Sequence, residues 1–354
     1  MLPIDAAPGC NPDPAKSNSM KAWAIDSYGG PEALRLHELP QPQVGANDVL
    51  IKVKAASLNP LDWKVRNGML KRIRSFDFPL ILGNDCAGVV KEVGSEVERF
   101  KVGDEVFTRV PKDRIGTLAE FISVDQSAVA LKPHNLSFEE AAGIPLVALT
   151  AWQALHDFVQ IGPGSRVLIQ AGAGGVGSLA LQIARLLGAE VYTTASLPKH
   201  ELVRSLGAHR AIDYRNERFE DCVSDCDLVL DTLGGESLKR SVEVLKKNGV
   251  IVSISGPLDP QTAQEMELNW LLRRVVRGMS WSIRREARKH GGTYRFLFMR
   301  PDGKQLAEIA ALLEQGKLKP LLDKVYSFEE APQAFEYVEK GHASGKVVVR
   351  IGGE

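Results

Sequence analysis

The stretch AGAGGVG at residues 171–177 contains the pattern Gly172-x-Gly174-x-x-Gly177. In a dinucleotide-binding unit, the first glycine allows a tight turn and the second lets the backbone approach a pyrophosphate, while the third lets the following helix pack closely on the sheet. The N-terminus of that helix offers free N–H groups and a positive dipole end to the phosphates. The backbone groups predicted to face the cofactor belong to Gly172, Gly174, Gly175, Val176 and Gly177. A glycine turn without a ligand is the alternative.

The sequence around the turn favours the cofactor interpretation. A strand is predicted before it, over Arg166–Ala171, and an apolar helix after it, over Gly175–Leu187, ending at Gly188. The alternation continues with strands at Glu190–Ala195, Ala211–Tyr214, Asp227–Thr232 and Val250–Ser255, and with helices at Lys199–Leu206 and from Glu236. Repeated βα units indicate a parallel sheet with helices on both faces. We therefore predict an α/β, Rossmann-type, doubly wound domain over residues 146–285.

The flanking sequence reads instead as short strands separated by glycines. Predicted strands on the N-terminal side are Val49–Ala56, Cys86–Val93, Glu105–Val110 and Leu118–Val124. A helix is predicted over Phe138–Phe158, with Ser137 and Glu140 as a capping box. On the C-terminal side, helices are predicted at Lys304–Leu313 and Phe328–Lys340, and strands at Lys324–Ser327 and Lys346–Ile351. We predict one discontinuous β-rich catalytic domain, made of residues 20–145 and 286–354.

Composition narrows the functional class. The 354 residues are 44% hydrophobic, and 44 basic residues balance 44 acidic ones, so no charge excess suggests a nucleic-acid or membrane partner. The longest apolar stretches are far shorter than the roughly 20 residues that span a bilayer. Four cysteines do not make a disulfide framework, which favours a reducing compartment, and we expect a cytoplasmic location. Residues 1–19, with four prolines, are predicted to be a flexible extension, with a transit segment as the alternative.

The end of the second strand bears on the choice between NAD and NADP. An NAD site usually places Asp or Glu there to hold the ribose hydroxyls. Here the strand ends Thr193-Thr194-Ala195-Ser196, with Lys199 three residues later. Hydroxyls and an ammonium suit a 2′-phosphate, which an acid would repel. NADPH is therefore the predicted cofactor, although Lys199 alone could be a solvated surface lysine.

Several further motifs resemble the medium-chain dehydrogenase/reductase superfamily, specifically its zinc-independent quinone oxidoreductase and alkenal/enone reductase branch. The resemblance covers about residues 20–351 and implies a GroES-like fold for the catalytic domain. The motifs that carry it are Asn59-Pro60-x-Asp62-x-x-x-Arg66-x-Gly68, Gly83-x-Asp85-x-Ala87-Gly88, Val102-Gly103-Asp104-x-Val106, AGAGGVG, and Gly341-His342-Ala343-Ser344-Gly345-Lys346.

The same resemblance implies that no catalytic zinc is present. In the zinc alcohol dehydrogenases of this superfamily, the metal is held by Cys and His ligands and a His-Glu pair. The matching positions here are Asn59, Lys64 and Asn84-Asp85, and the cysteine lobe that would hold a structural zinc is absent from Phe107–Thr117. The nearest cysteine pair, Cys222 and Cys226, is interpreted as two buried structural thiols.

Asn59 and Lys64 are the predicted catalytic residues. The Asn59 amide would bond the substrate oxygen or the nicotinamide ribose, and the alternative is a turn-forming Asn-Pro step. The Lys64 ammonium would stabilise or protonate an enolate, and the alternative is a solvated helix-face lysine. Lysine here, where quinone reductases often have tyrosine, shifts the expected substrate towards enones and alkenals. Asp62 and Arg66 are interpreted as a structural pair at helical spacing.

Most of the remaining cofactor contacts are implied by the resemblance. Tyr214 is expected beside the 2′-phosphate with Ser196 and Lys199, with Arg215 as a substitute partner. The contacts that the resemblance implies near the nicotinamide are Thr150, Phe298 and Lys346. Their alternatives are a helix hydroxyl bonded to its own backbone for Thr150, core packing for Phe298 and a surface charge for Lys346. Leu233 and Gly256 are predicted to contact the cofactor because they follow successive strands at the carboxyl edge of the sheet, where ligands bind. His342 is given no role.

The sequence therefore predicts an NADPH-dependent, zinc-independent oxidoreductase that transfers a hydride to a quinone or an α,β-unsaturated carbonyl compound. A catalytically idle NADPH-binding protein with a structural or regulatory role is one alternative, and a metal-dependent alcohol dehydrogenase is another. A homodimer is expected, with the strand-like run Val275–Trp281 as its candidate edge.

Overall fold

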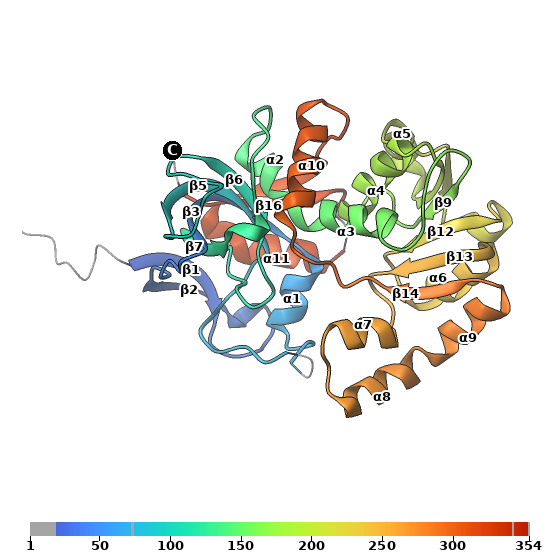
Figure 1. The fold of residues 1–354 in the computed structure, drawn as a ribbon, viewed down its shortest axis with the longest axis horizontal. Coiled ribbons are helices and arrows are strands. Elements are labelled where there is room, and N and C mark those ends of the chain that lie inside the picture. The colour runs from blue at the N-terminus through green and yellow to red at the C-terminus, as the bar shows by residue number, and fades with distance from the viewer. Residues whose placement is uncertain (1–18, 72–73, 342, 353–354) are drawn as a thin grey trace, which may run out of the picture.

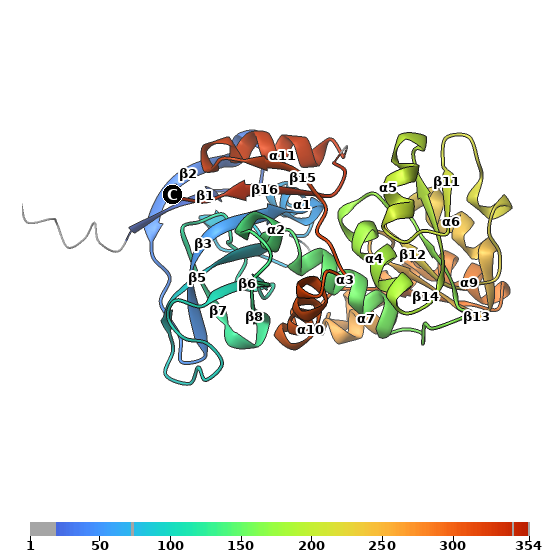
Figure 2. The same ribbon diagram turned by 90° about the horizontal axis from the view of Figure 1, so that it is seen from above.

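The computed structural model describes residues 19–71, 74–341 and 343–352, which form two lobes side by side (Figures 1 and 2). The predicted extension, apart from Ser19, and His342 lie outside these residues. The strands are β1 (Ser19–Ile25), β2 (Leu34–Pro40), β3 (Asp48–Leu58), β4 (Leu80–Ile81), β5 (Asp85–Val93), β6 (Glu105–Arg109), β7 (Phe121–Asp125), β8 (Val129–Leu131), β9 (Arg166–Ile169), β10 (Glu190–Ala195), β11 (Arg210–Asp213), β12 (Cys226–Asp231), β13 (Leu245–Ser253), β14 (Thr293–Phe296), β15 (Leu322–Tyr326) and β16 (Lys346–Arg350).

The α-helices are α1 (Pro60–Arg66), α2 (Phe138–Ala142), α3 (Pro145–His156), α4 (Gly175–Leu186), α5 (His200–Ser205), α6 (Gly235–Arg240), α7 (Pro260–Glu265), α8 (Trp270–Met279), α9 (Trp281–Lys289), α10 (Gly303–Glu314) and α11 (Ala331–Glu339). Short 3-10 helices are η2 (Pro31–Ala33), η3 (Gln126–Ala128), η4 (Leu197–Lys199), η5 (Phe219–Asp221), η6 (Ser241–Val244) and η7 (Phe328–Glu330). Among the described residues, none of the helices combines the length and the apolar character needed to cross a membrane.

The nucleotide lobe is a parallel sheet covered on both faces. Its strand order is β11-β10-β9-β12-β13-β14, and all neighbouring strands run parallel. Successive side chains of a strand point to opposite faces. Val167 and Ile169 of β9 accordingly join the core that includes α4, whereas Leu168 joins the core beneath α6 and α9. The predicted Rossmann-type architecture is confirmed.

The second lobe is the β-rich domain, and both ends of the described chain contribute to it. Its seven-stranded sheet follows the order β15-β16-β3-β5-β6-β8, with β7 also paired to β3, and a smaller sheet has the order β2-β1-β4. β16 pairs antiparallel with β3, for example Val348 opposite Ser57. The C-terminal segment therefore completes the sheet that the N-terminal segment begins, so the domain is discontinuous as predicted.

The predicted domain boundary at residues 285 and 286 is wrong. It falls within α9, and β14, which follows it, pairs in parallel with β13 as the last strand of the nucleotide sheet. The chain returns only after Phe296, and α10 then packs against β8 and α3. Val275–Trp281 is also not a strand, because Asn269 caps the helix α8 by accepting a hydrogen bond from the Leu272 backbone N–H at 3.0 Å.

The predicted helix at Phe138–Phe158 is two helices. The capping box is present, since Ser137 Oγ accepts from the Glu140 backbone and the Glu140 carboxylate accepts from the Ser137 backbone. The first helix nevertheless ends at Gly143, and α3 begins at Pro145, which has no N–H to continue the earlier helix. This break places the N-terminus of α3 beside the catalytic domain.

Candidate active site between the two domains

The glycine turn joins β9 to α4 as predicted, and two of its glycines are required by packing. A Cβ on Gly172 would lie 2.2 Å from Thr193 Oγ1, and a Cβ on Gly177 would lie 2.3 Å from the Ala171 carbonyl oxygen. Both distances are far below contact distance, so the strand, the turn and the helix approach one another only because these side chains are absent. Gly177 brings α4 onto the sheet in the way that the sequence pattern predicts.

Gly174 has a different role, because the space around it is open. It caps α4 in an extended conformation, and a Cβ there would meet a single atom, the Ala171 oxygen at 3.2 Å. The packing of the protein constrains this glycine less than Gly172 or Gly177, and close approach of a ligand is the role that the sequence pattern predicts for it. The backbone N–H groups at the start of α4 face the same region, so the turn fits a pyrophosphate.

The hydroxyls at the end of β10 are only partly available to a ligand. Thr193 Oγ1 donates to the Ile169 oxygen at 2.6 Å, and Thr194 Oγ1 accepts from the Ala171 backbone at 3.0 Å. Both threonines are buried, so they hold the turn instead of facing a 2′-phosphate. Of the predicted run of hydroxyls, Ser196 is the one that remains half-buried at the strand end.

Ser196, Lys199 and Tyr214 lie at one edge of the sheet. The parallel register pairs Ala195 with Asp213, which places Ser196 next to Tyr214 on the adjoining strand. The 3-10 helix η4 begins directly after Ser196, and Lys199 is its last residue. Tyr214 is 57% exposed and carries the Arg215 guanidinium over its ring at 5.7 Å. Two cations, a hydroxyl and an aromatic ring therefore gather at this edge.

Leu233 and Gly256 follow β12 and β13 at the carboxyl edge of the sheet. The buried Asp231 carboxylate fixes this edge by accepting from Ser253 Oγ and from the Leu233 and Gly234 backbones. Leu233 is exposed. A Cβ on Gly256 would lie 2.5 Å from Tyr294 Oη, so packing alone accounts for this glycine.

Lys346 is not a surface charge, because it is 6% exposed. Its ammonium donates to the Leu58 oxygen at 3.0 Å and to Asn59 Oδ1, and lies 3.8 Å from Asp85 Oδ2. A Cβ on Gly175 would lie 3.1 Å from Lys346 Cδ. The lysine stem therefore rests on the glycine turn, while its ammonium reaches the catalytic domain. Burial lowers the pKa of Lys346, and the nearby Asp85 and Asp62 carboxylates oppose that shift.

Asp85 is the acceptor at the centre of this cluster. It accepts from Ser57 Oγ at 2.9 Å, from Asn59 Nδ2 at 3.0 Å and from the Leu146 backbone at the start of α3 at 3.0 Å. Burial raises the pKa of Asp85, and the Lys346 ammonium is the largest effect opposing the rise. A carboxylate at a helix N-terminus is stabilised by the helix dipole, so Asp85 ties the catalytic domain to α3.

Asn59 therefore holds the cluster together from within. Its oxygen accepts from Lys346, its amide donates to Asp85, and its residue is 2% exposed. Asn59 also begins α1, where its backbone N–H donates to Asp62 Oδ2 at 2.7 Å.

Asp62 and Arg66 do not pair with each other, contrary to the sequence-based interpretation. Asp62 accepts from Asn84 Nδ2 at 2.7 Å, whereas Arg66 pairs with Glu339 at 2.7 Å. Burial raises the pKa of Asp62 to about 6, against the hydrogen bonds from Asn84 and the Asn59 backbone. The two residues point to opposite neighbours of α1, so their helical spacing does not bring them together.

The other predicted residues are placed as follows. Lys64 is half-buried on α1, with its ammonium 5.7 Å from the Trp63 ring. Thr150 Oγ1 donates to the Leu146 oxygen at 2.7 Å, which is the alternative given for it. Phe298 lies on the segment that returns to the catalytic domain and contacts Lys112 of that domain.

Comparison with known proteins identifies the family of this chain. Residues 45–134 match the family model "Alcohol dehydrogenase GroES-like domain", and residues 206–349 match "Zinc-binding dehydrogenase". The chain is 37% identical to the mouse NAD(P)H oxidoreductase RTN4IP1, mitochondrial, covering 99% of this chain and 94% of the relative. It is 37% identical to an Arabidopsis thaliana NADPH-dependent alkenal/one oxidoreductase, chloroplastic, covering 97% and 83%. The chain belongs to the quinone oxidoreductase and alkenal/enone reductase branch of the medium-chain dehydrogenase/reductases.

A solved structure supports the two-domain fold of this medium-chain reductase. The quinone oxidoreductase from Coxiella burnetii superposes with a TM-score of 0.81 at 33% identity, covering 94% of this chain and all of that one. The GroES-like and Rossmann domains predicted from the sequence are thereby confirmed, and so is its assignment as an oxidoreductase.

The residues at the zinc-ligand positions of the wider superfamily do not fit zinc. Asn59 and Asn84 carry neutral amides where thiolate and imidazole ligands are required, and the Asn59 oxygen already accepts from the Lys346 ammonium. Nowhere in the described parts of the chain do three or more His, Cys, Asp or Glu residues gather as a metal site.

The cysteine pair Cys222 and Cys226 differs in part from the prediction of two buried thiols. Cys226 is buried as predicted, whereas Cys222 is only half-buried and donates to Glu217 at 3.6 Å.

Sequence reasoning missed Ser57, Arg109 and the central position of Asp85. Arg109 lies opposite Asp85 in the β5–β6 ladder and is buried, and burial lowers its pKa. The sequence signal that could have identified these residues is the presence of polar side chains inside otherwise apolar strands.

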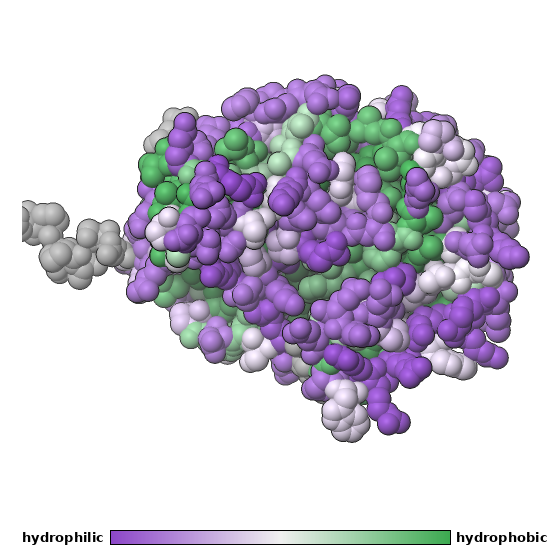
Figure 3. Space-filling model, viewed as in Figure 1, coloured by the Kyte–Doolittle hydropathy of each residue, from purple (hydrophilic) through white to green (hydrophobic). Residues whose placement is uncertain are grey.

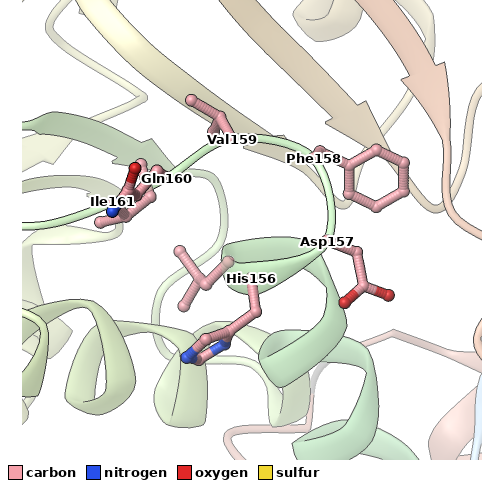
Figure 4. A pocket seen from close by; sticks show the side chains of 7 residues that line it. His156, Asp157, Phe158, Val159, Gln160 and Ile161 are labelled. Carbon is pink, nitrogen blue, oxygen red and sulfur yellow. The ribbon is translucent and has the colours of Figure 1, made fainter.

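A separate hollow of about 350 Å³ lies at the far end of α3 (Figure 4), where His156 bonds Trp152 and Asp157 pairs with Arg300. These side chains have local partners, and the hollow does not belong to the site.

Proposed function

We propose that this protein binds NADPH and transfers its hydride to a quinone or an α,β-unsaturated carbonyl compound without a metal ion. The observation that carries the proposal is the position of Lys346, which packs on the glycine turn and bonds Asn59. A lysine ammonium thus occupies the place where a zinc enzyme needs metal ligands. The absence of a Lewis acid suits an acceptor that conjugation already makes electrophilic.

NADPH is the better cofactor for this site. NADPH supplies the hydride, and the Arabidopsis relative is named as NADPH-dependent. Gly174 leaves room for the pyrophosphate, and Ser196, Lys199 and Tyr214 lie where a 2′-phosphate would extend. Lys346 and Asn59 would orient the nicotinamide end, because they join the turn to the catalytic domain.

Lys64 is the residue that we propose to act on the acceptor. When a hydride adds to the β-carbon of an enone, the electron pair moves to the carbonyl oxygen and an enolate forms, which then takes a proton at carbon. The Lys64 side chain is half-buried on α1, the helix that begins directly after Asn59, and its ammonium can donate a hydrogen bond to that oxygen. With a quinone, the same contact would stabilise the phenolate oxygen.

The experiment is NADPH oxidation by the purified protein with a small quinone, an alkenal and an enone, before and after treatment with a chelator. We expect turnover that the chelator leaves unchanged, and Lys64→Met should lower kcat/KM by about 100-fold. The exposed Lys91→Met is the matched control. Tight NADPH binding without turnover of any acceptor would favour the catalytically idle alternative, and loss of activity on chelation would favour a metal enzyme.

We also propose a homodimer and a cytoplasmic location. β14 ends the six-stranded sheet, so one of its edges has no partner strand in the described chain. Pairing of two β14 edges replaces the predicted edge at Val275–Trp281, which is helical. Light scattering that gives the mass of one chain would reject the dimer, and cell fractionation tests the location.

A further inference from the structure

The helices α8 and α9 form an exposed surface of unusual composition, which we call the α8–α9 surface (residues 270–290). Figure 1 shows the two helices along the lower edge of the nucleotide lobe, on the side away from α4 and α5. In Figure 3 this edge mixes strongly hydrophilic surface with surface of intermediate hydropathy. Two properties of this surface stand out, namely its exposed apolar side chains and its positive charge.

Large apolar side chains are concentrated on α8 and at the start of α9. Five of the fifteen exposed large hydrophobic residues among the described residues fall within twelve positions, namely Trp270, Leu271, Val275, Met279 and Trp281. Leu271, Val275 and Met279 are spaced by four and therefore line one face of the helix. The buried residues Val276 and Ser280 lie beside this stripe and hold α8 against the protein. The apolar stripe is thus turned outward by the packing of α8 itself.

The charge of this surface is strongly positive in a chain whose formal net charge is zero. Residues 270–290 contain six arginines and Lys289 against Glu286 alone, which gives a net charge of +6. None of these arginines forms an ion pair with a described residue, whereas nine arginines elsewhere do. Burial lowers the pKa of Arg284, and Arg288 and Arg277 lower it further, while Asp259 opposes the shift. Lys289 pairs with Glu286, so the arginines are the cations that are crowded here without an ion pair to a described residue.

A hollow of about 570 Å³ opens between the two helices. It is lined by Arg274, Arg277, Gly278 and Trp281. The Arg285 guanidinium lies 5.1 Å from the centre of the ring of Trp281, which is one of the residues that line the hollow. Guanidinium groups bind phosphate through paired N–H groups, so the hollow suits a phosphate group beside a tryptophan.

We propose that the α8–α9 surface binds the headgroup layer of an anionic phospholipid membrane, with α8 lying in the plane of the membrane surface. Interfacial helices combine arginines with exposed Trp and Leu side chains in this way, and clusters of four to eight cations on such helices attract anionic lipid. The arginines and the hollow would contact lipid phosphates, while Leu271, Val275 and Met279 would enter the boundary of the acyl chains.

Two other occupants fit the surface less well. A second copy of this chain would meet it across a two-fold axis, so the same arginines would face one another. A nucleic acid would satisfy the guanidinium groups but would leave the aliphatic stripe against a charged backbone. The membrane surface satisfies both the charge and the apolar stripe.

Flotation of the full-length protein with vesicles tests the proposal. Vesicles of phosphatidylcholine alone are compared with vesicles that also contain phosphatidylglycerol, at low and high salt. Arg274→Glu/Arg277→Glu should weaken binding to the anionic vesicles by at least about 30-fold, since each cation contributes about 1 kcal/mol. Lys304→Glu/Lys317→Glu, at and after α10, makes the same change in net charge at exposed positions and should have little effect. Val275→Ser/Met279→Ser should also weaken binding, without altering charge.

Several outcomes would overturn the proposal. Equal binding to neutral and anionic vesicles would do so, as would equal losses in the Arg274/Arg277 variant and its control. If the wild-type protein is an oligomer without lipid that Arg274→Glu/Arg277→Glu dissociates, the surface belongs to a second copy. Retention of a DNA duplex with no flotation on either vesicle would assign the surface to nucleic acid. Circular dichroism of each variant confirms that the fold is kept.

Discussion

The glycine turn and the polar cluster around Lys346 touch each other, yet they are built in opposite ways. The turn consists of seven consecutive residues, and its requirement is that no side-chain atoms intrude, as the distances at Gly172 and Gly177 show. The cluster joins Ser57, Asn59, Asp85 and Lys346 from separate segments, and its requirement is that every buried charge keeps its partners. The turn should therefore be sensitive to added volume, and the cluster to a lost charge.

Loss of the Lys346 ammonium is expected to have the largest effect on the cluster. Lys346→Met keeps much of the stem against Gly175 but leaves Asp85 buried without its cation. Removing one partner of a buried ion pair typically costs about 3–5 kcal/mol, and urea unfolding at neutral pH measures the loss. Adding Asp85→Asn should recover part of that loss, because the Asp85 carboxylate is then no longer buried without the Lys346 ammonium, although Arg109 loses the Asp85 charge.

The exposed Lys317→Met is the matched control for this experiment. Equal stability of the single and double variants would show that the pair does not act as a unit. An unchanged Lys346→Met protein would show that the cluster does not depend on charge balance.

Ionisation of Asp62 provides the second test of the cluster. The pKa of Asp62 is raised by burial from 3.8 to about 6, so the folded protein holds this proton more tightly than the unfolded chain does. Folding stability from this group is therefore full below about pH 4 and is lost as the pH rises to about 6, by about 3 kcal/mol. Unfolding free energies measured across that range should fall less steeply in Asp62→Asn than in the wild type.

In Asp62→Asn, the new side-chain N–H group needs an acceptor. Asn84 Oδ1 is buried without a hydrogen-bond partner among the described residues, so a flipped Asn84 amide can accept a hydrogen bond from the new side chain. Asp85 shares the direction of its pKa shift with Asp62, and only the difference between the two proteins isolates Asp62. Parallel profiles for the wild type and Asp62→Asn would contradict the assignment. The exposed Asp77→Asn serves as the control.

The turn should respond to volume in two distinct ways. Gly177→Ala places a Cβ against backbone atoms of Ala171 and Gly172, at 2.3 and 2.8 Å, and should destabilise the protein by about 1–3 kcal/mol. Gly174→Ala makes one tight contact, with a backbone oxygen at 3.2 Å, so its thermal stability should fall much less than that of Gly177→Ala. Its affinity for NADPH should nevertheless fall by about tenfold or more, or about 1.4 kcal/mol, because the methyl group occupies the ligand side. Calorimetry and NADPH titration separate the two effects, and a stable Gly177→Ala protein would refute the packing argument.

The same contrast explains what the sequence could predict. The glycine turn, the βα alternation and the capping box at Ser137 are local patterns, and all three are present in the structure. The partners of Lys346 come from positions almost 300 residues away, and nothing in its neighbours distinguishes it from a surface lysine. The run Val275–Trp281 was misread as a strand because a segment of seven residues with mixed apolar and polar side chains is too short for its periodicity to separate a strand from a helix. The threonines of β10 were misread because their bonds to the turn depend on the register of two strands.

The 2′-phosphate end of the cofactor site combines both kinds of construction, and it should show the smallest effect. Ser196 and Lys199 are local, but Tyr214 and Arg215 are brought to them by the register of β10 and β11. Lys199→Ala should raise the Kd of NADPH about tenfold and leave that of NADH unchanged, since one charged hydrogen bond contributes about 1.5 kcal/mol at such a site. Lys304→Ala is the control for a general loss of charge. If Lys199→Ala has no effect and Arg215→Ala raises the Kd instead, the phosphate is held by the non-local half of the site. In that case the prediction of NADPH would rest only on the missing Asp or Glu at the end of β10, and not on the Lys199 side chain.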